Sequence, residues 1–205
     1  MIEMNERMKK KNFEKQIKNR FEESQKIIKK SQILTLKIDK SVNMILDSLR
    51  VGGKIIIFGN GGSAADAQHM SAEFIGRYLL ERKSIPSISL TTDSSILTSI
   101  SNDYKFEEVF SRQCEALVNE NDVIIAISTS GKSPNIIKGI KMCIKKGAKV
   151  IALTGKDGGK LKKLCDILLN IPSNETPRIQ EGHRTVIHII CELVEKEIWQ
   201  KILLQ

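Results

Sequence analysis

The stretch IIIFGNGGSAADAQHMSAEF, from Ile55 to Phe74, decides the fold of this chain. It begins with a short apolar run, continues through a glycine-rich turn and ends in a segment with helical character. A strand, a tight turn and a helix in that order form the first part of a βαβ unit. The predicted helix carries His69 and Glu73, which are four residues apart and therefore share one face.

The chain repeats this alternation as far as its C-terminus. Short apolar runs predict strands at 54–59, 87–90, 122–128, 148–155 and 166–172. Helical patterns lie at 64–81, 95–103, 105–119, 133–147 and 158–166, and a long amphipathic helix is expected over 177–204, with Pro177 near its first turn. Because the runs show little polar alternation, they suit strands covered on both faces. The sequence therefore predicts an α/β fold with a five-stranded parallel sheet and helical crossovers.

Residues 1–50 differ in character from the rest. From about residue 5 they are rich in Lys, Glu, Gln, Ile and Leu and hold no Pro or Gly, which predicts two helices broken near KSQILTL, residues 30–36. We therefore expect an N-terminal helical extension over 1–50 and a single globular unit over 51–205.

Composition narrows the class of protein. The chain has 205 residues, of which 40% are hydrophobic and 28% charged, as in an ordinary globular protein. No apolar run is long enough for a membrane span, and the N-terminus lacks the apolar core of an export signal. The four cysteines are scattered without a C-x-x-C pair and suit reduced core positions: Cys114, Cys143, Cys165 and Cys191. The expected location is cytoplasmic.

The net charge of +9 requires a nucleic-acid partner to be considered. Much of the excess lies between Arg7 and Lys30, where interleaved glutamates are typical of a solvated helix face. Aromatic residues make up only 4% of the chain, too few for a base-stacking surface. A nucleic-acid role is therefore not favoured, and the basic excess would help attract anionic substrates.

Polar residues follow three of the predicted strands, as GNGGS, TTDSS and STSGKS. The carboxyl ends of parallel strands lie at one edge of a sheet, so these segments should converge. The third offers hydroxyls and a helix start, which together favour phosphate: Ser128, Thr129, Ser130 and Ser133. It does not satisfy the Walker A pattern, and an ordinary helix cap by Ser133 with Pro134 at the first position is the alternative.

The glycine turn has two interpretations of its own. Gly59, Gly61 and Gly62 permit close approach of a ligand to the backbone, but their spacing does not match the dinucleotide-binding pattern. The alternative is a structural turn with Asn60 at a positive φ.

His69 and Glu73 on one helix, with Gln180, Arg184 and His188 at steps of four on another, form a second candidate site. Two imidazoles, a carboxylate and an amide oxygen suit Zn²⁺ or a similar divalent ion. Glu73 and His188 would equally serve as general base and acid without metal. A lone helical histidine is more often structural, and the spacing leaves these alternatives open.

Several of these segments resemble the sugar isomerase (SIS) domain family. They are GNGGSAADAQHMSAEF, SISND, ISTSGKSPN, ALTGKDGG and RIQEGHRTVIHII, and from about residue 30 to 200 they are more narrowly similar to bacterial phosphoheptose isomerases, which act on sedoheptulose 7-phosphate. The resemblance implies a flavodoxin-like sheet and a homotetramer with active sites between subunits. It also implies conversion to D-glycero-D-manno-heptose 7-phosphate through an enediol, the first step of nucleotide-activated heptose biosynthesis.

The resemblance further implies roles for particular residues. The sugar phosphate would contact Asn60, Gly61, Gly62, Glu73, Asn102, Asp103, Ser128, Thr129, Ser130, Ser133 and Gln180. One Zn²⁺ per subunit would be held by His69, Glu73, Gln180 and His188. Glu73 and His188 match the acid/base pair of the family, with the direction of proton transfer open. Pro177 stands where some members have an acidic residue, which puts one substrate contact in doubt.

Two other functions remain to be weighed. Some SIS proteins are non-catalytic tetramers that bind sugar phosphates or the replication initiator, but the nearest such relative lacks the counterparts of Glu73 and His188. A different sugar isomerase, acting on a hexose or pentose phosphate, is the other alternative.

Overall fold

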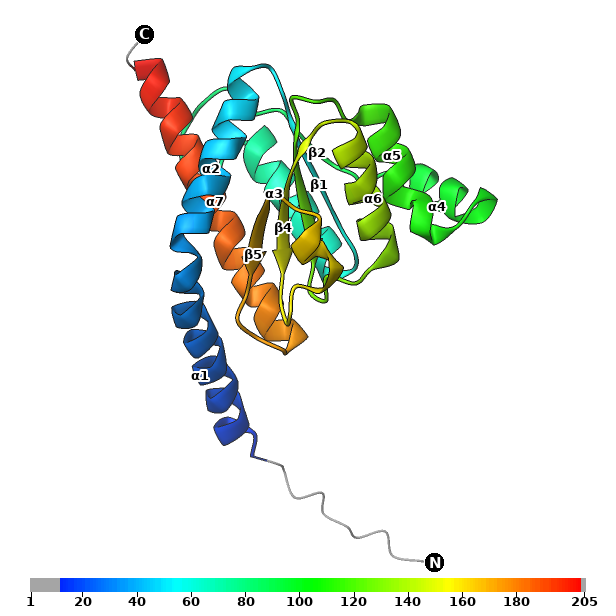
Figure 1. The fold of residues 1–205 in the computed structure, drawn as a ribbon. Helices are drawn as coiled ribbons and strands as arrows, with labels where there is room; N and C mark the ends of the chain where they lie inside the picture. The colour runs from blue at the N-terminus through cyan, green and yellow to red at the C-terminus, as the bar shows by residue number, and fades with distance from the viewer. Residues whose placement is uncertain (1–11, 204–205) are drawn as a thin grey trace, which may run out of the picture.

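Five short parallel strands form one sheet in the order β2-β1-β3-β4-β5 (Figure 1). The computed structural model describes residues 12–203, with side chains for residues 12–200. The first eleven residues of the predicted extension, and Leu204 and Gln205 of the predicted unit over 51–205, therefore lie outside the described part. The strands are β1 Ile55–Gly59, β2 Ser87–Ser89, β3 Val123–Ser128, β4 Lys149–Thr154 and β5 Ile167–Asn170. This order is that of flavodoxin-like sheets, and it confirms the predicted fold class.

The apolar strands are buried on both faces, which explains why their sequences show so little polar alternation. In β1, Ile55 and Ile57 face one core cluster, while Ile56 and Phe58 face the other. All four side chains are fully buried. The sheet therefore forms the middle layer of three.

Helices cover both faces of the sheet, as Figure 1 shows. On the first face lie α2 Thr35–Arg50, α3 Gly62–Ile75 and α7 Thr176–Leu203, and on the second lie α5 Val109–Leu117 and α6 Pro134–Lys145. Short 3₁₀ turns complete the crossovers: η2 Phe106–Glu108 and η3 Gly159–Lys163. The side chains of α2 pack into the same core as α3 and α7.

The predicted break in the N-terminal helices is confirmed. Helix α1 Glu14–Ser31 leads through η1 Gln32–Leu34 into α2. Only Ser31 of α1 is buried, and the helix extends beyond the body of the molecule (Figure 1). Helix α4 Ser94–Asp103 has no buried residue and projects on the opposite side (Figure 1). No described helix combines the length and apolar character needed to cross a bilayer.

Three predicted helices are clearly shorter in the structure than in the sequence analysis. The pattern at 105–119 forms the η2 turn and then α5 over Val109–Leu117 only. Helix α3 ends at Ile75 rather than at residue 81, and the chain continues without regular structure to β2. The helical pattern at 158–166 forms only the η3 turn, because Gly158 and Gly159 both take positive φ, at 78° and 54°, and so oppose an α-helical start.

Candidate functional site

The loops after β1 and β3 meet at the carboxyl edge of the sheet. The side-chain amides of Asn60 and Asn135 exchange two hydrogen bonds of 2.9 Å each, although they are 75 residues apart in the sequence. Asn135 is 2% exposed, so the pair is locked into the base of the site. The positive φ of the first loop falls on Gly61, at 56°, and not on Asn60. The predicted convergence of these two loops is therefore observed.

The β3 loop presents its hydroxyls at the start of α6. Pro134 occupies the first turn of α6, but the Ser133 hydroxyl makes no capping hydrogen bond. It lies instead 3.3 Å from the Ser128 hydroxyl. The Ser130 hydroxyl accepts a hydrogen bond from the Lys132 backbone N–H at 3.2 Å. Because the cap is not made, the Ser133 hydroxyl is free to join the helix N–H groups in binding an anion.

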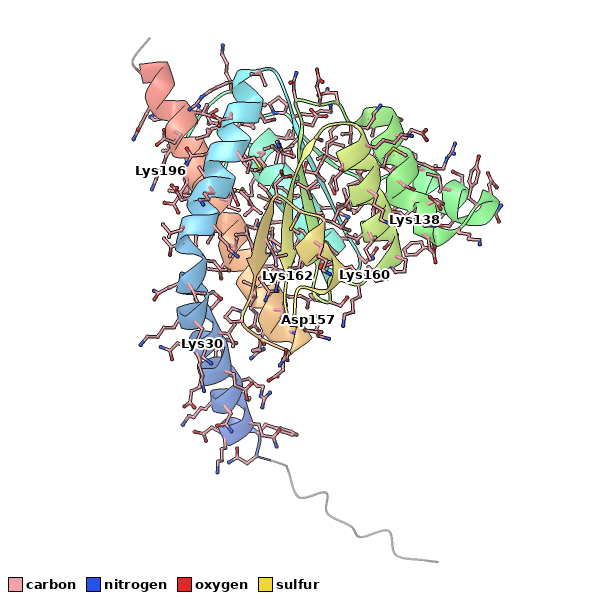
Figure 2. All side chains as sticks on the ribbon, viewed as in Figure 1. Lys30, Lys138, Asp157, Lys160, Lys162 and Lys196 are labelled. Carbon is pink, nitrogen blue, oxygen red and sulfur yellow. The ribbon has the colours of Figure 1, made fainter. Side chains whose placement is uncertain are left out.

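We call the loop from Ser128 to Ser133 the cradle. A third loop, after β4, supports it. The backbone N–H of Gly155 donates to the Thr129 carbonyl at 3.1 Å, and that of Lys160 donates to the Gly131 carbonyl at 2.9 Å. Gly131 has a φ of 62°, and a Cβ there would lie 2.2 Å from the Gly158 carbonyl oxygen. Figure 2 labels Asp157 on this loop and Lys160 in the η3 turn that follows it. The two loops can approach so closely only because Gly131 has no side chain.

Helices α3 and α7 lie side by side from their first turns onward. The Gln180 amide packs so tightly on Gly62 that a Cβ there would lie 2.3 Å from its nitrogen. One turn further on, Arg184 Nη2 lies 2.6 Å from the Asp66 carboxylate. Beyond that pair, His69 and His188 meet. Residue numbers rise together along both helices, so α3 and α7 run parallel.

The two histidines bring the predicted acid/base residues together. His69 Nε2 lies 2.9 Å from His188 Nε2, a hydrogen-bond distance, so only one of the two nitrogens donates. His69 Nε2 is also 3.3 Å from Glu73 Oε1. All three side chains are partly exposed. Glu73 and His188 thus both contact one imidazole nitrogen within a single chain.

Burial and charge both act on this cluster. Burial lowers the pKa of His69, and the nearby Arg184 guanidinium lowers it further, against the opposing effect of Glu73. Burial raises the pKa of the Asp66 carboxyl despite its ion pair with Arg184. A largely neutral His69 is a suitable hydrogen-bonding partner or metal ligand.

The donor atoms fit a divalent metal in chemical type. Two imidazole nitrogens and a carboxylate oxygen are ligands that Zn²⁺ accepts, and a tetrahedral site would place two such nitrogens about 3.3 Å apart. The observed 2.9 Å between His69 and His188 would need to widen by a few tenths of an ångström. As the described residues stand, no three His, Cys, Asp or Glu side chains form a metal-binding group. Gln180, the fourth predicted ligand, lies against Gly62, about 10 Å along α3 from His69.

Three predicted residues lie apart from this cluster. Asn102 and Asp103 are exposed at the end of α4, where the Asn102 amide donates to the Asp103 carboxylate at 2.9 Å. Helix α4 packs on η2 and α5, away from α3 and α7 (Figure 1). Pro177 is exposed in the first turn of α7.

Sequence analysis missed several residues that shape the site. The Tyr78 ring lies 5.7 Å from the His188 ring, and a buried ion pair joins Arg82 to Glu195 at 3.1 Å. The pattern offered one signal: Glu195 is seven residues beyond His188, two turns along an apolar face where a glutamate is unexpected. No local signal marks Tyr78.

A cavity of about 640 Å³ lies at the opposite, amino edge of the sheet. Its lining includes Lys40, Met44, Val51, Asp122 and Lys149. Its lining contains neither Glu73 nor His188 and none of the hydroxyls of the β3 loop, and in parallel sheets ligands bind at the carboxyl ends of the strands. We therefore place the candidate site at the loops after β1 and β3 and on helices α3 and α7, and not in this cavity.

Comparison with known proteins gives consistent matches over most of the chain. The model of the SIS domain family matches residues 19–155. A phosphoheptose isomerase of Geobacter sp. (strain M21) is 53% identical over 164 residues, 80% of this chain and 85% of that protein. One from Campylobacter jejuni subsp. jejuni serotype O:6 is 51% identical over 180 residues, 88% of this chain and 97% of that protein. The structure of a phosphoheptose isomerase from Neisseria gonorrhoeae superposes with a TM-score of 0.86 at 41% identity, over 90% of this chain and 100% of that one.

Proposed function

This chain belongs to the phosphoheptose isomerases of the SIS domain family, and from that premise we propose that it interconverts sedoheptulose 7-phosphate and D-glycero-D-manno-heptose 7-phosphate. The reaction supplies heptose biosynthesis. It is an aldose–ketose isomerisation, in which a proton moves between adjacent carbons by way of an enediol.

One observation carries this proposal: Glu73 and His188 come from two different helices, α3 and α7, and both approach the same nitrogen, His69 Nε2. An isomerase needs one group to remove the C–H proton and another to protonate the neighbouring oxygen. We assign Glu73 as the base and His188 as the acid. With both groups beside His69, the carboxylate and the imidazole would act on adjacent carbons of one bound sugar.

The phosphate would be held at the far end of the substrate. The hydroxyls of Ser128, Ser130 and Ser133 and the N-terminal N–H groups of α6 offer neutral donors to an anion. Binding there fixes the sugar relative to Glu73 and His188, and such positioning lowers the entropic cost of proton transfer. Asn60, Gly61 and Gly62 line the same approach, where the bare glycine backbone lets the sugar come close.

We also propose that His69, Glu73, Gln180 and His188 hold a Zn²⁺ ion. The imidazoles and the carboxylate are already adjacent, and Gln180 would have to swing from Gly62 towards them. When bound, the ion would polarise the substrate oxygen as a Lewis acid. Elemental analysis of protein purified without chelator tests this assignment, and a zinc content far below one per chain contradicts it.

We further propose a cytoplasmic homotetramer with active sites between subunits. In one chain, α4 packs on the core through Leu97 and Ile100, while its Asn102 and Asp103 remain exposed. A second subunit packed on that exposed side would bring Asn102 and Asp103 to a neighbouring site. The four cysteines are free, and three of them are buried, which suits a reducing compartment.

The decisive assay supplies purified protein with sedoheptulose 7-phosphate and Zn²⁺ and follows the appearance of aldoheptose phosphate. Turnover of this substrate and not of pentose or hexose phosphates supports the proposal. A folded, zinc-loaded protein that yields no product would remove the isomerase assignment. If that protein binds sugar phosphate without converting it, the non-catalytic alternative is favoured.

A further inference from the structure

We propose that the buried Arg82–Glu195 ion pair is a positioning device that holds the end of α3, which carries Glu73, in place against α7, which carries His188. The proposal rests on the isomerase function above. It assigns a role to two charged residues that do not themselves reach the reacting atoms.

Glu195 organises the chain that follows α3. Its carboxylate accepts hydrogen bonds from three consecutive backbone N–H groups, at 2.8 Å from Tyr78, 2.6 Å from Leu79 and 2.9 Å from Leu80. Burial alone would raise the pKa of this carboxyl, but the three N–H donors and Arg82 outweigh burial and lower it. Glu195 is therefore an ionised side chain that is only 1% exposed, and the backbone of residues 78–80 folds around its carboxylate.

Arg82 secures the last turn of α3. Its Nη2 donates to the carbonyl of Glu73 at 2.7 Å, and its Nη1 donates to the carbonyls of Phe74 at 2.8 Å and Gly76 at 3.1 Å. Its Nε donates to Glu195 at 3.1 Å. The last carbonyls of a helix have no partner within the helix, and a cation at that end also interacts favourably with the helix dipole. One planar guanidinium thus joins the backbone of Glu73 directly to α7.

The position of the pair on α7 matters as much as its contacts. Glu195 lies seven residues, or two turns, beyond His188 on the same helix. Tyr78, whose N–H binds Glu195, places its ring against that of His188. The pair therefore fixes three parts of the site together: the backbone of Glu73, the ring beside His188 and the relative placement of the two helices.

Stability alone does not account for such a pair. Burying two charges costs about as much free energy as their attraction returns, and apolar side chains of similar volume are often as stable. Catalysis, in contrast, is sensitive to placement, since a shift of about 1 Å in a reacting group costs about 100-fold in rate. The expected effect of weakening the pair is therefore a loss of kcat.

The test is Arg82→Lys in the full-length, zinc-supplied protein. A lysine keeps the charge opposite Glu195 but cannot span the carbonyls of Glu73 and Phe74 at once. We expect kcat to fall about 10- to 100-fold with KM within about threefold of the wild type, because the phosphate cradle is untouched. Amide hydrogen exchange at residues 73–80 should speed up in the same variant, a readout that does not depend on turnover.

The matched control is Lys196→Gln, which breaks an exposed ion pair with Glu192 on the outer side of α7, one residue from Glu195 (Figure 2). It should leave kcat within about twofold. A folded Arg82→Lys variant with wild-type kcat and exchange overturns the proposal. If that variant does not fold at 10 °C, Glu195→Gln takes its place under the same criteria, and failure of both to fold assigns the pair to folding and rejects the positioning role. A wild type without turnover would refute the isomerase function, while the exchange measurement still decides whether the pair fixes the end of α3.

Discussion

Glu73 has contacts that separate its role in chemistry from any role in holding the fold. Among residues 12–200, its carboxylate makes one polar side-chain contact, with His69 at 3.3 Å, while its carbonyl is held by Arg82. Glu73→Gln keeps the shape of the side chain and removes its ability to accept a proton. We expect kcat to fall by about 10²- to 10⁴-fold with substrate affinity within about threefold, measured by product formation and calorimetric titration. Near-normal turnover would show that Glu73 is not the base.

In the proposed function, Ser130 lies at the phosphate end of the site. Ser130→Ala removes one hydroxyl donor to a charged group, and we expect KM to rise about tenfold with kcat nearly unchanged, because that contact is the same in the ground and transition states. Steady-state kinetics measures both constants. Thr35→Ala is the control, since its exposed hydroxyl donates to the Gln32 carbonyl at the start of α2. A fall in kcat instead of a rise in KM would place Ser130 in the chemical step.

His183 links stability to pH. It is fully buried, its Nε2 bonds to the Thr154 carbonyl at 3.0 Å, and burial lowers its pKa to about 4 against that hydrogen bond. Between pH 6.5 and 4, His183 binds a proton in the unfolded chain but not in the folded chain. The free energy of unfolding therefore falls as the pH falls. The loss attributable to His183 is about 3 kcal/mol.

His183→Gln isolates this effect, because glutamine can donate to the same carbonyl but does not titrate. Urea unfolding of wild type and variant at pH 7 and pH 4.5 should show a smaller loss of stability in the variant. Equal losses in both proteins would mean that His183 titrates normally in the fold.

At the level of elements, the five strands could be predicted from their composition, because strands that are buried on both faces are apolar along their whole length. The residues of the cradle, Ser128 to Ser133, could also be predicted, because parallel strands end at one edge of the sheet and the loops that follow them meet there. The path of residues 76–86 could not. It depends on Arg82 and Glu195, which are 113 residues apart, and no local pattern encodes that contact. The separation of Gln180 from His69 is likewise a matter of side-chain packing on Gly62.

The approach of the β3 and β4 loops gives a prediction about elements. Gly131→Ala would force an unfavourable positive φ and a clash with the Gly158 carbonyl, so we expect a loss of about 2–4 kcal/mol in the free energy of unfolding and a raised KM. Gly52→Ala is the matched control: its φ is also positive, at 79°, but nothing lies within 4 Å of a Cβ there. It should cost about 1 kcal/mol and leave KM unchanged. Equal effects of the two changes would show that the loops do not depend on their close contact.

At the level of the whole molecule, helix α1 and the residue before it carry an apolar stripe that the described part of the chain, residues 12–203, leaves exposed. Phe13, Ile17 and Phe21 follow one another at steps of four, with exposed fractions of 52%, 54% and 73%. Apolar surface rimmed by charged residues, on a helix that extends from the body, is typical of a subunit interface. The stripe on α1 therefore supports the proposed homotetramer independently of the argument from α4.

Phe21→Asp places a charge in the middle of this stripe and should dissociate the assembly. Light scattering of the wild type should give four times the chain mass of 23.0 kDa, and the variant a lower mass. Turnover should fall with the mass if Asn102 and Asp103 serve a neighbouring subunit, because in one chain they lie away from the histidines. Lys15→Ala changes the net charge equally on the opposite side of α1 and should leave both mass and turnover intact. A wild type that runs as a fully active monomer would show that each site is complete within its own chain. A Phe21→Asp variant that stays tetrameric would show that α1 is not at the interface.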